Sequence, residues 1–289
     1  MFNSHEIKAR MKGIEDTKQI THAMQLISAS KLKKAMKLYE NNRIYFKELR
    51  FVIKDILTHS DKIVHPYFVR RDGKRIAFVI ITSDKGLAGE YNKKVLEIAD
   101  REINKAEEKY IFTIGNMANE HFKKQGREID IEFLHIVQNP TLDDARQMTY
   151  DILELYDQNI LDEVNIIYTS MQSASRNRPD IIKVLPLEVE DFKVVEDYDD
   201  DTIRDRFDFE PSPQEVVDIL TPQYVLGLIY GALVQSVAAE HFERMVAMKT
   251  ALDNADKMLK TLKLMSQRAR QEKITTELQE ITVASLGNA

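Results

Sequence analysis

The residues that could do chemistry gather in one loop, "ITSDKGLAGEYN", at positions 81–92. It follows an apolar stretch and carries Lys85, Gly86 and Gly89, as loops that hold a nucleotide phosphate often do. A Rossmann fingerprint requires G-x-G-x-x-G and a P-loop requires G-x-x-x-x-G-K-[ST], and this loop has neither. Glu90, directly after the second glycine, would repel a phosphate. We therefore interpret the glycines as a tight strand-to-helix turn and expect no nucleotide site.

Other catalytic and metal sites have little support in the sequence. The seven histidines are scattered without H-x-x-x-H or H-E-x-x-H spacing, and there is no Cys for thiol chemistry, disulfides or Cys-ligated zinc. An acidic run could bind a hard cation through Asp197, Asp199, Asp200 and Asp201. However, this run lacks the Gly and the terminal Glu of an EF-hand loop, so we interpret it as an exposed acidic loop. The basic segment 31–37 has few aromatic neighbours, and the net charge is −6, so nucleic acid is not expected. We expect no catalytic residue, metal or cofactor.

Long helices without breakers are predicted at both ends of the chain. No Pro precedes Pro66 or follows Pro222. Near the C-terminus, residues spaced alternately four and three apart predict a left-handed coiled coil: His241, Met245, Met248, Leu252, Ala255, Leu259, Leu262, Ser266 and Ala269. A weaker N-terminal stripe is interrupted by small and polar residues: Ile7, Met11, Ile14, Ile20, Met24, Ile27, Leu32 and Ala35. We expect segments 1–60 and 212–286 to pair as an antiparallel coil.

The middle segment, 74–206, alternates strands and helices. Strands are predicted at 75–83, 109–116, 129–136, 163–171 and 180–189, and helices at 93–108, 117–126 and 141–158. Thr141 is the expected N-cap of the last helix, with Asp144 at the capping-box position. The alternation predicts an α/β domain with a largely parallel sheet, whose last two strands form an antiparallel edge pair.

The lengths of the end helices imply partner chains. At about 1.5 Å per residue, helices of about 55 and 65 residues run about 80 and 100 Å, whereas a domain of about 130 residues is only about 30 Å across. Most of such a coil would project beyond its own domain, and we expect other chains to cover its far end. Charge is also uneven: residues 1–50 hold 11 Lys/Arg against 5 Asp/Glu, and residues 188–210 hold 3 against 11.

Neither a membrane span nor a signal peptide is expected. No stretch approaches about 18 uninterrupted apolar residues, and the N-terminus reaches charge within six residues without an apolar core. The absence of a long leader rich in Arg and Ser favours a bacterial chain over an imported organelle precursor.

Three segments together resemble the gamma subunit of F-type ATP synthases. They are "IKARMKGIEDTKQITHAMQLISASKLKKA" (7–35), "ITSDKGLAGEYN", and "ERMVAMKTALDNADKMLKTLKLMSQRARQEKITTELQEI" (243–281). The order of elements agrees as well, so the resemblance spans effectively the full chain. It implies an α/β fold class: a long antiparallel left-handed coiled coil of the two termini beside a Rossmann-like domain that does not bind nucleotide.

The resemblance also implies a function and a set of partners. The chain would be the noncatalytic central-stalk rotor of a proton-translocating ATP synthase, coupling c-ring rotation to conformational change in the beta subunits, which do the ATP chemistry. Its partners would be three alpha and three beta subunits, the epsilon subunit and the c-ring. It would be a peripheral protein on the cytoplasmic face of a bacterial cell membrane.

Individual residues carry the resemblance further. Met24 matches a methionine that contacts an acidic beta-subunit loop, and "QRARQ" supplies the matching beta contacts Arg268, Arg270 and Gln271. Two interpretations stay open for Lys31, Lys33 and Lys34: they either meet acidic beta loops or form a solvated face. Phe209 and Glu210 resemble the foot segment that meets the c-ring, although the family often has Tyr at the first position.

Some positions depart from the family pattern. Ala88 stands where Cys is common, Glu90 where a small residue is common, and His22 where Lys is usual. Two other functions stay open at this point. A coiled-coil scaffold without a rotary role would share the heptads but not the three motifs, and an α/β nucleotide enzyme would need a complete glycine motif.

Overall fold

The computed structural model describes residues 4–60, 63–134, 136–173, 176–193 and 209–286. They fall into two compact units: unit 1 combines residues 4–29 with 244–286, and unit 2 comprises the described residues between 30 and 243. Two long helices, α1 (Ser4–His59) and α6 (Pro213–Leu286), contribute to both units. Long terminal helices are therefore confirmed. Each of them is divided between the two units, so one part of each helix belongs to the same unit as the α/β part.

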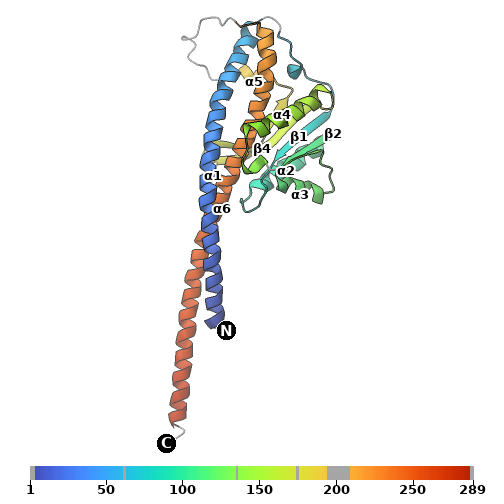
Figure 1. The fold of residues 1–289 in the computed structure, drawn as a ribbon. Helices are drawn as coiled ribbons and strands as arrows, with labels where there is room; N and C mark the ends of the chain where they lie inside the picture. Colours follow the sequence, from blue (N-terminus) through green and yellow to red (C-terminus); the bar gives the residue numbers. More distant parts are fainter. Residues whose placement is uncertain (1–3, 61–62, 135, 174–175, 194–208, 287–289) are drawn as a thin grey trace. The chain divides into compact units, whose positions relative to one another are not determined.

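Unit 2 contains a five-stranded sheet in the order β3-β2-β1-β4-β5 (Figure 1). Its strands are β1 (Arg75–Ile81), β2 (Glu108–Ile114), β3 (Ile131–Phe133), β4 (Glu163–Ser173) and β5 (Arg176–Leu185). The first four strands are parallel, and β5 pairs antiparallel with β4, as the sequence predicts. The strand order reverses between β1 and β4, the position at which open α/β sheets usually bind their ligands.

The strands are connected by α2 (Tyr91–Lys105), α3 (Asn116–Lys124), the 3₁₀ turn η2 (Ile136–Gln138) and α4 (Leu142–Asp157). The 3₁₀ turn η1 (Pro66–Phe68) precedes β1, and the single turn α5 (Glu190–Lys193) follows β5. The predicted capping box of α4 is present: Asp144 N–H donates to Thr141 Oγ1 at 3.1 Å, and Thr141 N–H donates to Asp144 Oδ2 at 3.0 Å.

The two faces of the sheet are buried by different helices. Successive residues of a strand point to opposite faces, so Phe78 and Ile80 join one core with side chains of α2 and α3. Val79 and Ile81 join the other, with side chains of α4, α1 and α6. The long helices therefore form one layer of the unit 2 core.

Within unit 2, α1 and α6 approach closely at Gly227. Asn42 Nδ2 donates to Gly227 O at 3.2 Å, and a Cβ atom at position 227 would lie only 2.6 Å from the Phe46 ring. The Phe46 ring stacks on Tyr224 with 4.7 Å between centroids. Glycine permits this helix spacing because it has no side chain.

The apolar character of α6 follows from this core position. Between Pro213 and Gln279 it contains an 18-residue window of mean hydropathy 1.4, long and apolar enough by composition to cross a membrane. However, 61% of that window is buried inside the protein, as in the core helix of a soluble domain. Val225 and Leu233, for example, are fully buried.

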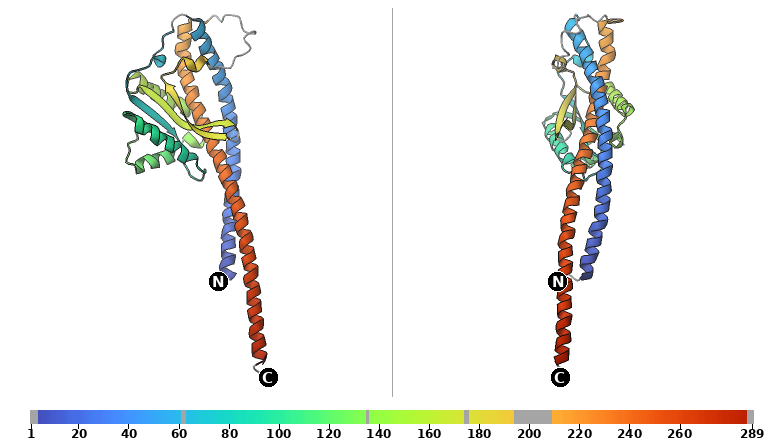
Figure 2. Two further views of the ribbon diagram at one scale, coloured as in Figure 1. Left: turned by 180° about the vertical axis from the view of Figure 1, so that it is seen from behind. Right: turned by 90° about the vertical axis from the view of Figure 1, so that its left-hand side faces the viewer.

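In unit 1, residues 4–29 of α1 and 244–286 of α6 form an antiparallel pair, and α6 extends past the first residue of α1 (Figure 2). The predicted α6 stripe is confirmed. Between residues 248 and 270, the residues that are not exposed are all members of it: Met248, Leu252, Ala255, Leu259, Leu262, Ser266 and Ala269. Met245 is half-buried as well, and His241, the first member of the stripe, is buried within unit 2.

The predicted α1 stripe is wrong at two positions in unit 1. Ile20 and Ile27 are 64% and 58% exposed. The seam, meaning the line of residues along which the two helices pack on each other, instead keeps the four-and-three spacing set by its first members. On α1 it consists of Ile7, Met11, Ile14, Lys18, Thr21, Gln25 and Ser28. The phase of the first turns decides which side faces α6, and the small hydroxyl residues leave room for the larger side chains of α6.

Candidate functional site

The loop after β1 is organised by its own side chains. Ser83 N–H donates to Asn92 Oδ1 at 3.0 Å, which ties the end of β1 to the first turn of α2. Asp84 Oδ1 accepts from Asn116 N–H, at the start of α3, at 3.2 Å, and its Oδ2 accepts from Gln138 Nε2 at 3.1 Å. Gly89 has φ 57°, as the turn prediction requires. A helix N-terminus attracts anions, and here the Asp84 carboxylate already lies at that of α3.

Helix α6 covers the end of the sheet at which a ligand would bind. Strand β4 pairs with β1 only as far as Ile167, and beyond that point α6 takes over. Thr169 N–H donates to Ser236 Oγ and Met171 N–H donates to Gln235 Oε1, each at 3.3 Å. These bonds protect an edge that would otherwise expose unpaired backbone groups. The crevice of a nucleotide-binding sheet is thus occupied by a helix of the same chain.

The described residues hold no group of three or more His, Cys, Asp or Glu side chains arranged for a metal ion. The four aspartates of the predicted acidic loop, 197 and 199–201, lie outside the described residues.

The predicted contact residues are spread along the chain and form no single site. Arg268, Arg270 and Gln271 are all exposed on α6 in unit 1. Lys31, Lys33 and Lys34 are exposed on α1 in unit 2. Phe209 is half-buried and Glu210 exposed, just before α6 begins.

Met24 lies far from the arginines within unit 1. It is half-buried beside the seam. Lys18 Nζ lies 2.5 Å from Asp256 Oδ1, so these two residues are at the same level of the coil. Met24 and Arg268 lie on opposite sides of that level, six and twelve residues away, which separates them by about 27 Å along the axis at about 1.5 Å per residue.

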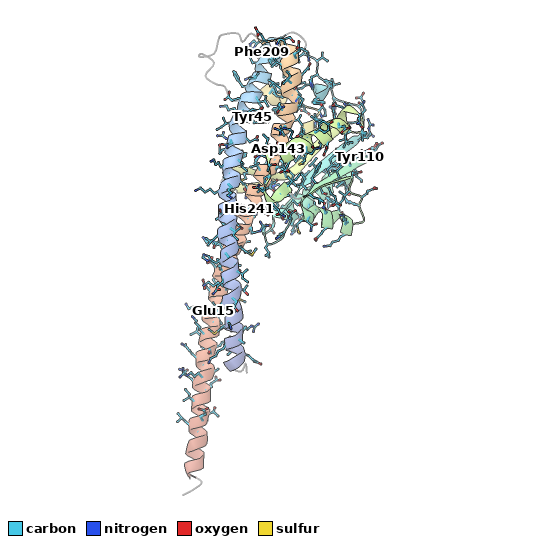
Figure 3. All side chains as sticks on the ribbon, viewed as in Figure 1. Glu15, Tyr45, Tyr110, Asp143, Phe209 and His241 are labelled. Atoms are coloured by element: carbon cyan, nitrogen blue, oxygen red, sulfur yellow. The ribbon has the colours of Figure 1, made fainter. Side chains whose placement is uncertain are left out.

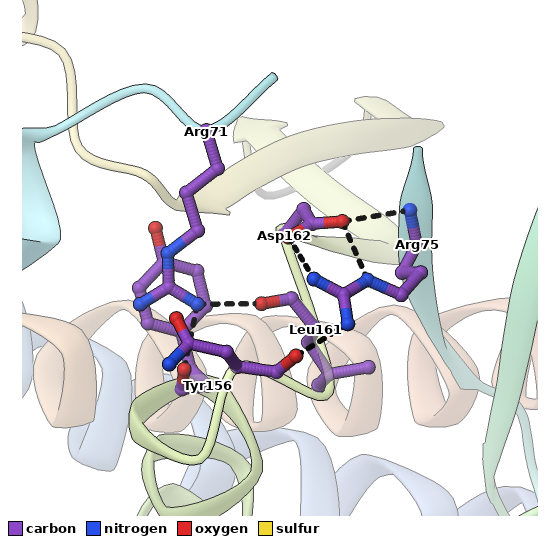
Figure 4. Close-up of polar contacts among 6 residues, drawn as sticks. Arg71, Arg75, Tyr156, Leu161 and Asp162 are labelled. Carbon is purple, nitrogen blue, oxygen red and sulfur yellow. Dashed lines mark hydrogen bonds and ion pairs between the residues drawn. The ribbon is translucent and has the colours of Figure 1, made fainter. Parts of the chain in front are cut away.

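A polar cluster that sequence reasoning missed lies at the start of β1 (Figure 4). Arg75 donates to Asp162 through Nε at 2.8 Å, through a terminal nitrogen at 2.7 Å and through its backbone N–H at 3.1 Å. Arg71 donates to the carbonyls of Tyr156 and Leu161 at 2.6 and 2.8 Å, and its guanidinium lies 3.7 Å from the centre of the Tyr156 ring. Nothing in the charged run 70–75 distinguishes these arginines from solvated ones.

This cluster is structural. The hydrogen bonds from Arg75 hold the pKa of Asp162 below its usual range. A carboxylate whose oxygens already accept these bonds, with a side chain only 3% exposed, is a poor general base. It joins the start of β1 to the connection between α4 and β4.

A second polar group fixes the segment between α1 and β1. His65 is buried and its Nδ1 accepts from Tyr67 N–H at 3.1 Å, while Tyr67 Oη donates to Asp157 Oδ2 at 3.0 Å. Burial lowers the pKa of His65, although the nearby Asp218 and Asp157 partly oppose this.

The chain matches known proteins over almost its whole length. A family model described as ATP synthase matches residues 3–285. An ATP synthase gamma chain from Acetivibrio thermocellus is 41% identical over 287 residues, which cover 97% of both chains. A gamma chain described as sodium ion specific, from Acetobacterium woodii, is 34% identical over 291 residues, covering 96% of both.

Solved structures share the fold. A chain in the mitochondrial ATP synthase of Euglena gracilis, described as OSCP/F1/c-ring, superposes with a TM-score of 0.69 at 18% identity, covering 98% of this chain and 94% of the other. A chain described as part of the rotor of the same enzyme superposes with a TM-score of 0.63 at 18% identity, covering 94% and 98%.

Proposed function

The chain belongs to the family of ATP synthase gamma chains, and we propose on this basis that it is the central-stalk rotor of a proton-translocating F-type ATP synthase. It couples rotation of the c-ring to conformational change in the catalytic beta subunits. The observation that carries this proposal is the 41% identity to a gamma chain over 97% of both sequences, which includes the coil and the α/β part alike.

In this role the chain supplies contacts and no chemistry of its own. ATP synthesis and hydrolysis take place on the beta subunits, and the chain is a peripheral protein on the cytoplasmic face of the bacterial membrane. The Asp84 carboxylate at the N-terminus of α3 and the cover of α6 over the sheet support the absence of a nucleotide site in the α/β part.

The exposed side chains of unit 1 support enclosure by other chains. Ile20, Met258 and Leu278 are each about 60% exposed, at 64%, 59% and 59%. Large apolar side chains exposed along both helices of the same coil are typical of a surface that meets a partner. We assign these contacts to a ring of three alpha and three beta subunits.

The mechanism depends on differences between the faces of the coil. The shaft changes the conformation of a beta subunit only if it binds the alternative conformations of that subunit with different free energies. A shaft that made the same contacts with all three beta subunits would not shift the conformation of any one relative to the others. Arg268 and Arg270 suit carboxylates of a beta loop because a guanidinium donates two parallel hydrogen bonds, and Gln271 adds an amide. Met24 makes a second contact, about 27 Å away along the coil.

The remaining contacts lie outside unit 1. Lys31, Lys33 and Lys34 face acidic beta loops, and Phe209 and Glu210 meet the c-ring beside the epsilon subunit. Phe209 has no hydroxyl, so its contribution to that contact is apolar.

The test is ATP hydrolysis by the chain co-expressed with alpha and beta subunits of the same organism. We expect an active complex with one copy of this chain, and no activity from the chain alone. Changing Arg268, Arg270 and Gln271 to Ala should lower the rate by about tenfold or more, since a hydrogen bond to a charged group contributes about 1.5–3 kcal/mol.

The matched control changes the exposed α6 residues Lys257 and Lys260 to Ala, and the rate should stay close to that of the unmodified complex. Failure to form a complex, together with nucleotide turnover by the chain alone, would refute the rotor role. A complex that forms but in which the triple variant behaves like the control would remove these three residues from the coupling contact.

A further inference from the structure

The seam of unit 1 separates two flanks of different chemistry. In an antiparallel pair, residues that directly precede a seam residue lie on one side of the coil in both helices, and residues that directly follow one lie on the other side. The first side therefore holds the residues just before Lys18, Leu252 and Leu259. The second side holds the residues just after Ile14, Met248 and Ala255. The ion pair between Lys18 and Asp256 agrees with this geometry, because Asp256 follows Ala255 and lies across the seam from Lys18.

One side, here called the apolar flank, holds no charged residue over a long stretch. Its members are Thr17, Ile20, Met24 and Ile27 of α1, and Ala247, Ala251, Asn254, Met258, Thr261 and Met265 of α6. Ile20, Ile27, Met258 and Met265 are 64%, 58%, 59% and 47% exposed. From Ala247 to Met265 the flank runs about 27 Å at about 1.5 Å per residue. Arg10 and Arg268 mark its end nearest the N-terminus of α1.

The other side, here called the charged flank, is rich in ionic groups. Its exposed members next to the seam, as far along α6 as Lys263, are Lys8, Glu15 and His22 of α1, and Lys249, Asp256 and Lys263 of α6. Glu15 is labelled in Figure 3, where side chains project from both helices of unit 1. Leu26 and Val246 are exposed large apolar residues on this side.

We propose that the apolar flank is the surface along which the coil contacts an apolar surface of the surrounding alpha and beta subunits, while the charged flank stays hydrated. This rests on the proposed rotor function and identifies which side of the shaft makes the close contact. The flank is continuous with the contact proposed for Met24.

The chemistry of the apolar flank suits a partner that changes during rotation. Apolar contact has no fixed hydrogen-bond geometry, so one partner surface can replace another without the breaking of specific bonds. Methionine adds to this because its unbranched side chain adapts to surfaces of different shape, and Met24, Met258 and Met265 all lie here. Ion pairs on the charged flank would have to break at each step if they were enclosed.

Two flanks of opposite chemistry also give the shaft the asymmetry that the mechanism requires. At any angle, the partner that faces the apolar flank gains from burial of apolar surface, and the partner that faces the charged flank does not. The difference between these two contacts is what biases the partners toward different conformations.

The absence of Cys from the chain allows a direct test, because one introduced cysteine labels one position. Met258→Cys and Lys263→Cys place an environment-sensitive fluorophore on the apolar and the charged flank, five residues apart on the same helix. Each labelled chain is measured alone and in the complex with alpha and beta subunits that hydrolyses ATP. We expect emission from position 258 to shift to the blue on assembly, and emission from position 263 to stay near its value in the free chain.

Equal shifts at both positions, or a larger shift at 263, would overturn the proposal. A blue shift at 258 in the free chain that grows with its concentration would identify a second copy as the occupant and would overturn it as well. If position 258 does not tolerate the label, Ile20→Cys with Glu15→Cys repeats the comparison on α1. Failure of the unmodified chain to assemble would instead refute the rotor function, so the two failures are distinct.

A substitution gives a second readout. Met258→Gln with Met265→Gln should weaken association with the alpha and beta subunits by about tenfold or more, whereas Lys263→Gln should leave it within about twofold. Dissociation rates of the labelled complex measure both. An equal effect of the two changes would contradict the assignment of the contact to the apolar flank.

Discussion

Replacement of Gly115 by Ala should be among the most destabilising single changes in unit 2. Gly115 follows β2, has φ 89° and is the N-cap of α3. A Cβ atom there would lie 2.2 Å from the backbone oxygen of Thr82, at the end of the neighbouring strand. Strain at this φ costs about 1–3 kcal/mol, and forcing a methyl group into packed structure costs about 1–3 more. We expect a loss of about 4 kcal/mol in the free energy of unfolding.

Two other glycines separate these contributions. Gly126 has φ 69° with no atom within 4 Å of a Cβ, so Gly126→Ala carries the backbone strain alone, about 1–2 kcal/mol. Gly86 has neither a positive φ nor a neighbour within that distance, so Gly86→Ala should change stability by less than about 1 kcal/mol.

Urea unfolding of the full chain, followed by circular dichroism, measures all three variants. The order of loss should be Gly115, then Gly126, then Gly86. If Gly115→Ala costs no more than Gly126→Ala, the close approach of Gly115 to the Thr82 carbonyl, and with it the packing of the two strand ends, would be refuted.

Three further predictions concern polar groups of unit 2. Because the pKa of Asp162 is lowered by Arg75, its stabilisation is present above its unfolded pKa of about 3.9 and is lost as pH falls further; Asp162→Asn should reduce the fall in urea midpoint over that range. His65 has a lowered pKa, so the unfolded chain binds the extra proton first and stability should fall as pH drops below about 6.5; His65→Asn should flatten this part of the profile. Ser236→Ala leaves Thr169 N–H without its acceptor, and hydrogen exchange at that amide should quicken by about tenfold, with central-strand amides such as that of Val79 unchanged.

Most of unit 2 follows from local sequence signals. The buried β1 is an apolar run, and the start of α4 is fixed by two hydrogen bonds between Thr141 and Asp144, so both can be placed from the sequence. The short β3, only Ile131–Phe133, begins after its predicted start because its length depends on how far β2 extends beside it. Strand β5 begins earlier than predicted because the β4–β5 hairpin continues past the sheet, where α6 supplies partners for β4.

The phase of the N-terminal stripe shows where sequence reasoning fails. Ile20 and Ile27 are the largest apolar residues of their segment, and a search for apolar periodicity selects them. The seam instead takes Thr21 and Ser28, since the spacing inherited from Ile7 and the large residues of α6 decide which side packs. A sequence taken alone cannot tell an apolar stripe reserved for a partner from one that packs within the chain.

The candidate contact residues follow from the sequence only in part. Arg268 and Met24 are proposed from the resemblance alone, since an arginine or methionine carries no local signal of its partner. Asp84 could be placed in the loop but not at the N-terminus of α3, because that contact joins segments 32 residues apart. The bond between Ser236 and Thr169 spans 67 residues and has no sequence signature at all.

The core shared by α1 and α6 sets an order of events during synthesis. Leu49 and Ile53 of α1 are buried against a cluster that includes Val225 and Leu233 of α6. At about 5–20 residues per second, the roughly 170 residues between these partners take about 10–35 s to emerge from the ribosome. For that time the first helix is complete while its apolar side chains still await burial. A nascent chain of this kind is a natural client for a chaperone that binds exposed apolar helices until the last segment arrives.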